Sequence, residues 1–387
     1  MYDDKIRKKL RGEKLALSHQ MGKKQDFQLF VPNKEFKKLR IRAGEYEVSE
    51  QDLERYSRQM LFPPIGVQGQ HKLAAAKVLL VGMGALGTVL SSHLVRSGVG
   101  MLRIVDRDYV EQSNLQRQML YDEEDVRQAY PKVIAARRKL EKINSQVRLE
   151  TEVADVTPLN VESLTDGMDI VLDGTDNFQT RLLLNDICFK RGIPFVYGGA
   201  VSSNGMSAIF VPGETCCFRC LLGSADGAGG QTCDTVGVIS PVVDMVASLQ
   251  ATEALKYLVG ASSARRNTML SIDIWNNQMH DMKLPEPSAA CPTCGKQQYP
   301  ALDVDADAAT TMCGRETVQI VGKLPFDLTL WAGRLAAVGT VSSNPYLLRV
   351  QLPEGERLVL FPDGRALVQG TEDTTRARVL YDRYIGS

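Results

Sequence analysis

The sequence lacks both an excess of charge of one sign and a long hydrophobic run. Its 387 residues carry 46 basic and 46 acidic side chains, so no overall field attracts nucleic acid or a membrane surface. The most apolar long stretch, residues 236–258, contains a proline and three charged side chains, which excludes a transmembrane helix. No apolar segment follows the charged N-terminus, which does not resemble a secretory signal. We expect a soluble cytoplasmic protein with no nucleic acid or membrane partner.

Residues 1–48 form a basic N-terminal extension without clear periodicity. They contain 13 Lys or Arg and 7 Asp or Glu, so the excess of basic charge is local. Such charge runs usually mark solvated chain, and we therefore favour a flexible tail over a binding arm.

After residue 49, short apolar runs alternate with segments of helical spacing. The predicted strands fall at 77–81, 101–105, 147–153, 169–172 and 194–197, and predicted helices between them include 86–96, a segment around 160, and 181–190. This βαβ order predicts an α/β fold with a Rossmann-like, doubly wound sheet. Apolar runs at 206–211 and 269–274 predict added antiparallel strands.

A long helix is predicted from Ser240 to the residue before Gly260, with Pro241 in its first turn. Its predicted buried face carries Val242, Val243, Val246, Leu249, Leu255 and Leu258.

An acidic, alanine-rich stretch around residues 303–311 separates two domains. The main domain is predicted at 49–300, and a small α+β unit at 301–387. The small unit has predicted strands at 318–321 and 346–352, a hairpin at 358–368 that turns at Pro362-Asp363-Gly364, and a helix at 373–384.

A glycine loop follows the first predicted strand. Gly82, Gly84 and Gly87 stand between a strand and a helix, where a tight turn and the helix N-terminus can bind phosphate. Asp106 ends the next strand and is placed to accept hydrogen bonds from ribose hydroxyls. These features alone suit NAD as well as ATP.

Polar side chains downstream favour a triphosphate. Asn114, Arg117 and Lys132 would add an amide and two cations near the loop, as a triphosphate and its pyrophosphate leaving group require. Asp176, followed by Asn177, comes after a predicted strand and is a natural ligand for Mg²⁺.

Two Cys-x-x-Cys pairs predict a structural metal site. Their members, Cys217, Cys220, Cys291 and Cys294, offer four thiolates to a tetrahedral Zn²⁺. Two pairs of free thiols are the alternative reading. Cys216 adds a fifth thiol that either competes as a ligand or is buried.

These motifs resemble, in order, the ThiF/MoeB/HesA family, relatives of the ubiquitin-activating enzymes. The resemblance spans about residues 50–295. It is carried by Arg55-Tyr56-Ser57-Arg58-Gln59, the glycine loop, Asp106, Ser113-Asn114-Leu115-Gln116-Arg117, Pro131-Lys132, Thr175-Asp176-Asn177, Cys217-Phe218-Arg219-Cys220 and residues 232–239.

The resemblance implies an enzyme that uses ATP to adenylate the C-terminal glycine carboxylate of a ubiquitin-like sulfur carrier and releases pyrophosphate. The residues expected to hold ATP and Mg²⁺ are Gly82, Gly84, Gly87, Asp106, Asn114, Gln116, Arg117, Lys132, Asp176 and Asn177. Arg58 would reach the phosphates from the partner subunit of a homodimer.

Cys233 lies in a glycine-rich region, at a position that can take the activated carrier as a thioester or acyl disulfide in the resembled family. A nucleophilic thiolate needs access and a low pKa, and Asp234 beside it gives no electrostatic help. A catalytic Cys233 and a bystander thiol therefore both stay open.

Segments 126–132, 313–320, 344–348 and 363–365 resemble the thiamine branch of the family, which acts on a ThiS-like carrier. A MoaD-like carrier in molybdopterin biosynthesis is the alternative. A nucleotide-binding oxidoreductase or a non-catalytic Rossmann scaffold is the alternative from another class. The tail is too short for a rhodanese-like domain, so we expect sulfur from a separate desulfurase or persulfide protein.

Overall fold

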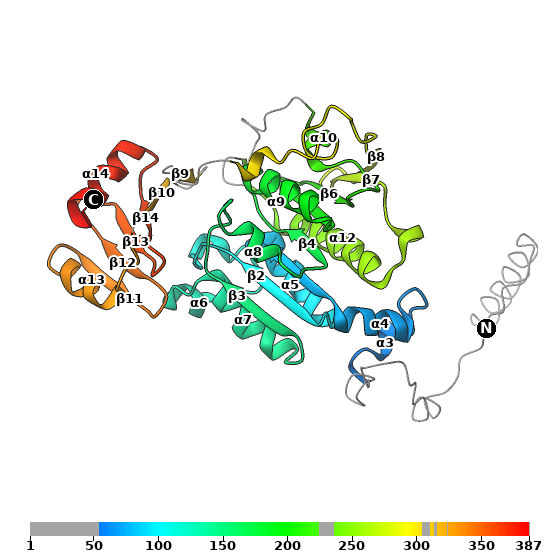
Figure 1. Cartoon of the computed structure of the whole chain (residues 1–387). Helices are drawn as coiled ribbons and strands as arrows, with labels where there is room; N and C mark the ends of the chain where they lie inside the picture. Colours follow the sequence, from blue (N-terminus) through cyan, green and yellow to red (C-terminus); the bar gives the residue numbers. More distant parts are fainter. Residues whose placement is uncertain (1–53, 224–235, 304–309, 313–315, 323, 387) are drawn as a thin grey trace, which may run out of the picture. The chain divides into compact units, whose positions relative to one another are not determined.

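The computed structural model describes residues 54–223, 236–303, 310–312, 316–322 and 324–386 (Figure 1). The predictions for residues 1–48, for Cys233 and for most of the segment 303–311 lie outside these ranges. Within them, every helix is too short or too polar to cross a membrane.

The main sheet has eight strands in the order β3-β2-β1-β4-β5-β6-β7-β8. The first five of these pair in parallel, and the last three pair antiparallel. The strands are β1 (Lys77–Val81), β2 (Met101–Val105), β3 (Arg148–Glu152), β4 (Ile170–Asp173), β5 (Phe195–Val201), β6 (Asn204–Phe210), β7 (Thr268–Asp273) and β8 (Gln278–Lys283). The predicted parallel sheet with added antiparallel strands is confirmed.

Helices cover both faces of this sheet. Val78 and Leu80 of β1 point into one core, and Leu79 and Val81 into the other, because successive side chains of a strand alternate. The first core is completed by α5 (Ala85–Ser97), α7 (Lys132–Ile143) and α12 (Ser240–Val259). The second is completed by α8 (Val161–Thr165), α9 (Phe178–Arg191) and α10 (Phe218–Leu222). Further helices are α3 (Ser57–Met60), α4 (Gly66–Ala75) and α6 (Glu123–Gln128).

The C-terminal unit is a six-stranded antiparallel sheet with two helices. Its strands, in the spatial order β11-β12-β13-β14-β10-β9, are β9 (Thr310–Met312), β10 (Thr317–Val321), β11 (Thr340–Ser343), β12 (Leu348–Gln351), β13 (Arg357–Leu360) and β14 (Arg365–Gln369). Side chains of α13 (Leu328–Leu335) and α14 (Thr374–Tyr384) join its apolar core. The predicted α+β appendage is confirmed, including the β13–β14 hairpin.

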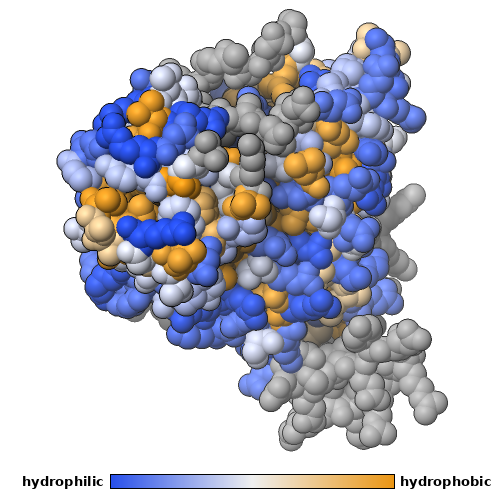
Figure 2. Space-filling model, turned by 60° about the vertical axis from the view of Figure 1, so that its left-hand side comes forward, coloured by the Kyte–Doolittle hydropathy of each residue, from blue (hydrophilic) through white to orange (hydrophobic). Residues whose placement is uncertain are grey.

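On the face of the molecule shown in Figure 2, apolar side chains lie in small groups among polar ones.

The order of the main sheet fixes where a ligand can bind. Going out from β1, the chain continues to β2 on one side, while β4 lies on the other. In open α/β sheets, ligands bind beyond the carboxyl ends of the strands at such a point of reversal. The glycine loop, Asp106 and the segment 174–177 all follow the carboxyl ends of these strands.

Candidate nucleotide-binding site and cysteine cluster

A pocket of about 290 Å³ lies at the carboxyl ends of β1, β2 and β4. The predicted site residues that line it are Gly82, Gly84, Asp106, Arg117, Lys132, Asp176 and Asn177. Four other predicted residues, Gly87, Asn114, Gln116 and Arg58, do not line it. Residues separated by more than ninety positions in the sequence therefore surround one cavity.

The three glycines of the loop have different surroundings. Gly82 has a φ of +90°, and a Cβ added there would lie 2.7 Å from the backbone of Gly174. A Cβ on Gly87 would lie 2.0 Å from the carbonyl oxygen of Gly82, whereas one on Gly84 would meet no described atom closer than 3.9 Å. Gly82 and Gly87 thus allow the turn to pack, and Gly84 leaves room in the pocket. The N–H groups in the first turn of α5 have no partner within the helix, which suits them to an anion.

Asp106 joins two loops of the pocket. One carboxylate oxygen accepts from the backbone N–H of Met83 at 2.6 Å, and the other accepts from that of Asp108 at 2.7 Å. Burial raises the pKa of Asp106, and the positive charge of Lys132 offsets part of this effect.

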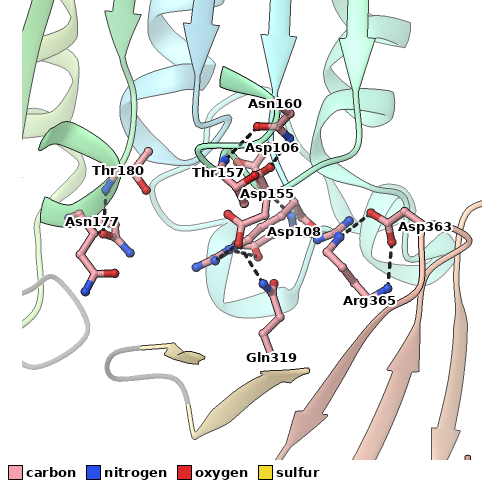
Figure 3. Close-up of polar contacts among 12 residues, drawn as sticks. Asp106, Asp108, Asp155, Thr157, Asn160, Asn177, Thr180, Gln319, Asp363 and Arg365 are labelled. Atoms are coloured by element: carbon pink, nitrogen blue, oxygen red, sulfur yellow. Dashed lines mark hydrogen bonds and ion pairs between the residues drawn. The ribbon is translucent and has the colours of Figure 1, made fainter. Parts of the chain in front are cut away.

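A chain of charges extends from Lys132 along the rim of the pocket. Lys132 is buried, and its Nζ lies 2.9 Å from the Oδ2 of Asp108. Arg107 lies 3.9 Å from Asp108 through Nε and 2.9 Å from Asp155 through Nη1. Arg107, Asp108 and Asp155 also line the pocket, and Figure 3 shows both carboxylates there. The sequence reasoning missed these three, although each closely follows the carboxyl end of a predicted strand.

The segment 113–117 has both pocket and framework residues. Arg117 lines the pocket, and its Nη1 donates to the carbonyl of Ser113 at 2.9 Å. Asn114 is buried, and its Oδ1 accepts from the N–H of Glu111 at 3.0 Å. Gln116 donates to the carbonyl of Val238 at 3.1 Å. Asn114 and Gln116 thus stabilise the segment that carries Arg117.

The loop after β4 is held by a buried ion pair. Arg181 Nε lies 2.8 Å from Asp173 Oδ2, and Arg181 Nη2 donates to the carbonyl of Thr175 at 2.6 Å. Asn177 caps α9, since its Oδ1 accepts from the N–H groups of Gln179 and Thr180. Asp176 is exposed between these fixed points, at the wall of the pocket.

Arg58 is exposed on the short helix α3, apart from the pocket lining of its own chain. Among the described residues, Arg58 therefore does not contribute to the pocket of its own chain.

The four predicted zinc ligands lie together. The Sγ atoms of Cys217 and Cys291 are 3.6 Å apart, those of Cys220 and Cys294 are 3.4 Å apart, and all four lie within 4.8 Å of one another. With Zn–S bonds of about 2.3 Å, the sulfurs of a tetrahedral site lie ~3.8 Å apart, so the cluster fits the ion.

The thiols of the cluster have shifted pKa values. Burial opposes ionisation of Cys291, but the N–H of Cys294 and the neighbouring thiols outweigh this and lower its pKa to about 7. Burial raises the pKa of Cys216 to about 12, and Cys216 lies outside the four-sulfur group. The structure therefore favours the buried-thiol reading of Cys216.

Comparisons with known proteins identify relatives of this chain. The profile of the ThiF family matches residues 56–293. The chain is 46% identical over 337 residues to the sulfur carrier protein ThiS adenylyltransferase of Bacillus subtilis, covering 86% of this chain and 99% of that protein. It is 36% identical over 252 residues to the molybdopterin-synthase adenylyltransferase of Escherichia coli, covering 65% of this chain and 99% of that protein. The crystal structure of E. coli MccB with ATP is similar with a TM-score of 0.55 and 26% identity, covering 62% of this chain and 74% of that one.

Proposed function

Because this chain belongs to the ThiF family, we propose that it is a sulfur carrier protein adenylyltransferase that acts on a ThiS-like carrier for thiamine thiazole biosynthesis. The 46% identity along nearly the whole Bacillus ThiS adenylyltransferase supports this substrate. An alignment of 337 residues necessarily enters the C-terminal unit, whereas the alignment with the molybdopterin enzyme covers only 65% of the chain. A MoaD-like carrier therefore fits less well, and curated relatives that are adenylyltransferases argue against an oxidoreductase or an inert scaffold.

The proposed reaction is attack of a carrier carboxylate oxygen on the α-phosphorus of ATP. The new P–O bond forms as the bond to the β-phosphate oxygen breaks, and pyrophosphate leaves. This chemistry needs alignment and charge neutralisation more than proton transfer. Gly84 and the start of α5 would approach the phosphates, Arg117 and Lys132 would neutralise them, and Asp106 would hold the ribose hydroxyls.

The metal ions have separate proposed roles. Asp176 would hold a Mg²⁺, which would neutralise negative charge on the phosphates, because Mg²⁺ commonly takes one or two carboxylate ligands. The four cysteines would hold a Zn²⁺ with no open ligand position, so this ion would be structural. Thiolate ligands suit a reducing compartment, which supports placing the enzyme in the cytoplasm.

The remaining assignments follow the resemblance. We keep residues 49–300 as the adenylation domain, with 301–387 as the small unit and 1–48 as an extension. We keep a homodimer in which Arg58 acts across the subunit boundary, and its exposure apart from its own pocket supports this. A separate desulfurase or persulfide protein would supply sulfur, with Cys233 as the candidate acceptor of the carrier.

The convergence of Asp106, Arg117, Lys132 and Asp176 on one pocket carries this proposal. Replacing Arg117 or Asp176 by Ala should abolish carrier-dependent exchange between ATP and pyrophosphate. Arg127→Ala is the matched control, because Arg127 is exposed on α6 and pairs with nearby Glu124. Undiminished exchange in both pocket variants would contradict the assignment. Mass spectrometry of ThiS-like and MoaD-like carriers incubated with Mg-ATP should find the acyl-adenylate on the ThiS-like carrier.

A further inference from the structure

We propose that the C-terminal unit supports the nucleotide site from behind, with Gln319 and Arg365 as positioning residues for the pocket wall. The inference rests on the proposed function, because it assumes that the pocket binds ATP. It goes further in assigning a role to a unit whose described residues do not themselves line the pocket.

Gln319 of β10 reaches across to the rim of the pocket. Its side chain is buried, and its Nε2 donates to Asp155 Oδ2 at 2.9 Å (Figure 3). The charge of Asp155 fixes the orientation of the amide, because the flipped amide would turn its oxygen toward a carboxylate. The Oε1 of Gln319 is buried and has no hydrogen-bond partner within the described ranges. A buried amide oxygen without a partner costs folding free energy, so the contact with Asp155 must offset this cost.

Arg365 of β14 binds the backbone of two pocket loops at once. Its Nη1 donates to the carbonyl of Arg107 at 3.2 Å, and its Nη2 donates to that of Val153 at 3.2 Å. Asp363 orients the guanidinium through Nε at 2.6 Å, as Figure 3 shows. The loops that follow β2 and β3 are therefore joined by one side chain of the C-terminal unit.

These contacts lead to the predicted phosphate-binding lysine. Asp155 accepts from both Gln319 and Arg107 through Oδ2, Arg107 also approaches Asp108, and Asp108 pairs with Lys132. These contacts of the Asp155 carboxylate are made through Oδ2, and Asp155 lines the pocket, so its Oδ1 is the oxygen left for a ligand. It can accept a hydrogen bond from the nucleoside, from an amino group or a hydroxyl.

An apolar contact backs the polar one. Tyr109 and Ala129 of the main domain form one buried cluster with Val359, Phe361 and Leu367 of the C-terminal sheet. Asn344 also donates to the carbonyls at 128 and 129, at 2.8 and 3.1 Å. This cluster alone is enough to pack the two parts of the chain together. Gln319 and Arg365 make additional polar contacts with residues that line or adjoin the pocket.

The first test removes the amide of Gln319. Gln319→Leu keeps nearly the same volume and should raise the KM for ATP in carrier-dependent exchange about tenfold, because a hydrogen bond to a charged group is lost. The kcat and the KM for the carrier should stay within about twofold of wild type. Gln351→Leu is the matched control, since Gln351 is an exposed glutamine of the same sheet on β12. Equal KM values for ATP in the two variants would overturn the proposal.

Exchanging the amide and the carboxylate between positions 319 and 155 tests whether Gln319 positions Asp155 or only packs against it. Gln319→Glu places two carboxylates together and should raise the KM for ATP more than Gln319→Leu does. Combining it with Asp155→Asn restores a donor and an acceptor between positions 155 and 319, but it removes the carboxylate oxygen that pairs with Arg107. The double variant should therefore recover part of the lost affinity and bind ATP better than Gln319→Glu alone. Additive losses would count against the pair.

Hydrogen exchange separates this proposal from the proposed function. In ATP-free protein, the backbone amides of 106–111 and 153–157 should exchange faster in Gln319→Leu than in Gln351→Leu. This readout needs no carrier and no turnover. If wild-type protein failed to adenylate any carrier, the proposed function would fail, yet faster exchange would still support the positioning role. Unchanged exchange at both loops would refute that role.

Discussion

Gly84 and Gly87 belong to one turn, but their missing Cβ atoms have different consequences. A Cβ on Gly87 would lie so close to the carbonyl oxygen of Gly82 that no side chain fits there. Gly84 has an ordinary φ of −77° and open space before it. Gly87 is therefore needed mainly for stability, and Gly84 mainly for ligand binding.

We predict that Gly87→Ala lowers the free energy of unfolding by at least about 2 kcal/mol, because the added Cβ would displace backbone atoms. Gly84→Ala should cost under about 1 kcal/mol, the loss expected at a helix N-cap, but should raise the KM for ATP. Urea unfolding and exchange kinetics on the same preparations measure both. If Gly84→Ala proved the less stable variant, this division of roles would be wrong.

At the scale of elements, the short apolar runs in the sequence predicted most strands of the main sheet. The buried strands β1 and β2 match their predicted ranges, and the β13–β14 hairpin turns at its Pro-Asp-Gly segment. Strand β8 was missed because its side chains are exposed throughout and show no apolar alternation. Helix α13, at residues 328–335, was missed as well, and it exposes much of its surface.

The face of α12 shows where apolar pattern alone misleads. Leu249 and Leu258 are only partly buried, whereas Gln250 and Glu253 are buried. Gln250 donates to the carbonyl of Asp173 at 2.8 Å, and Glu253 accepts from the N–H of Arg266 at 3.0 Å. Polar side chains can therefore take core positions when a distant backbone group is their partner, and sequence spacing does not reveal that partner.

The same limit applies to the pocket. Asp106, Arg117, Lys132 and Asp176 stand in short local motifs, so the sequence could nominate them. The contact of Gln319 with Asp155 joins residues 164 positions apart, one in strand β10 of the C-terminal sheet and the other in the loop that follows β3 of the main sheet. No local signal predicts such a pair from a single sequence.

The cysteine cluster links two distant segments of the main domain, the start of α10 and residues 291–294. We predict about one zinc per chain in protein purified without chelator, and loss of that zinc in Cys294→Ser. Since structural zinc contributes on the order of 10 kcal/mol, the Tm should fall by more than about 5 °C. Cys188→Ala is the control, because Cys188 is a buried thiol outside the cluster and its loss should keep the zinc. Metal content well below one per chain in wild type would reject the site.

At the scale of the whole molecule, the proposal places Arg58 in the pocket of a partner subunit. The described pocket is lined by the carboxylates of Asp106 and Asp176 and by the cations Arg117 and Lys132. Arg58 lies exposed elsewhere on the same chain. A symmetric dimer would place each subunit's Arg58 at an equivalent position, so both pockets would be completed together. The alternative is that Arg58 is a surface residue without a role in adenylation.

Subunit mixing distinguishes these two possibilities. Arg58→Ala and Asp176→Ala should each be inactive as homodimers, yet a mixed dimer would contain one pocket with both residues intact. Random subunit exchange makes about half of the dimers mixed, so the mixture should regain about a quarter of wild-type exchange activity. Mixing Arg58→Ala with the Arg58→Ala/Asp176→Ala double variant supplies no intact pocket and should stay inactive. If Arg58 had no role in adenylation, the Arg58→Ala homodimer would itself be active, and both mixtures would contain active pockets.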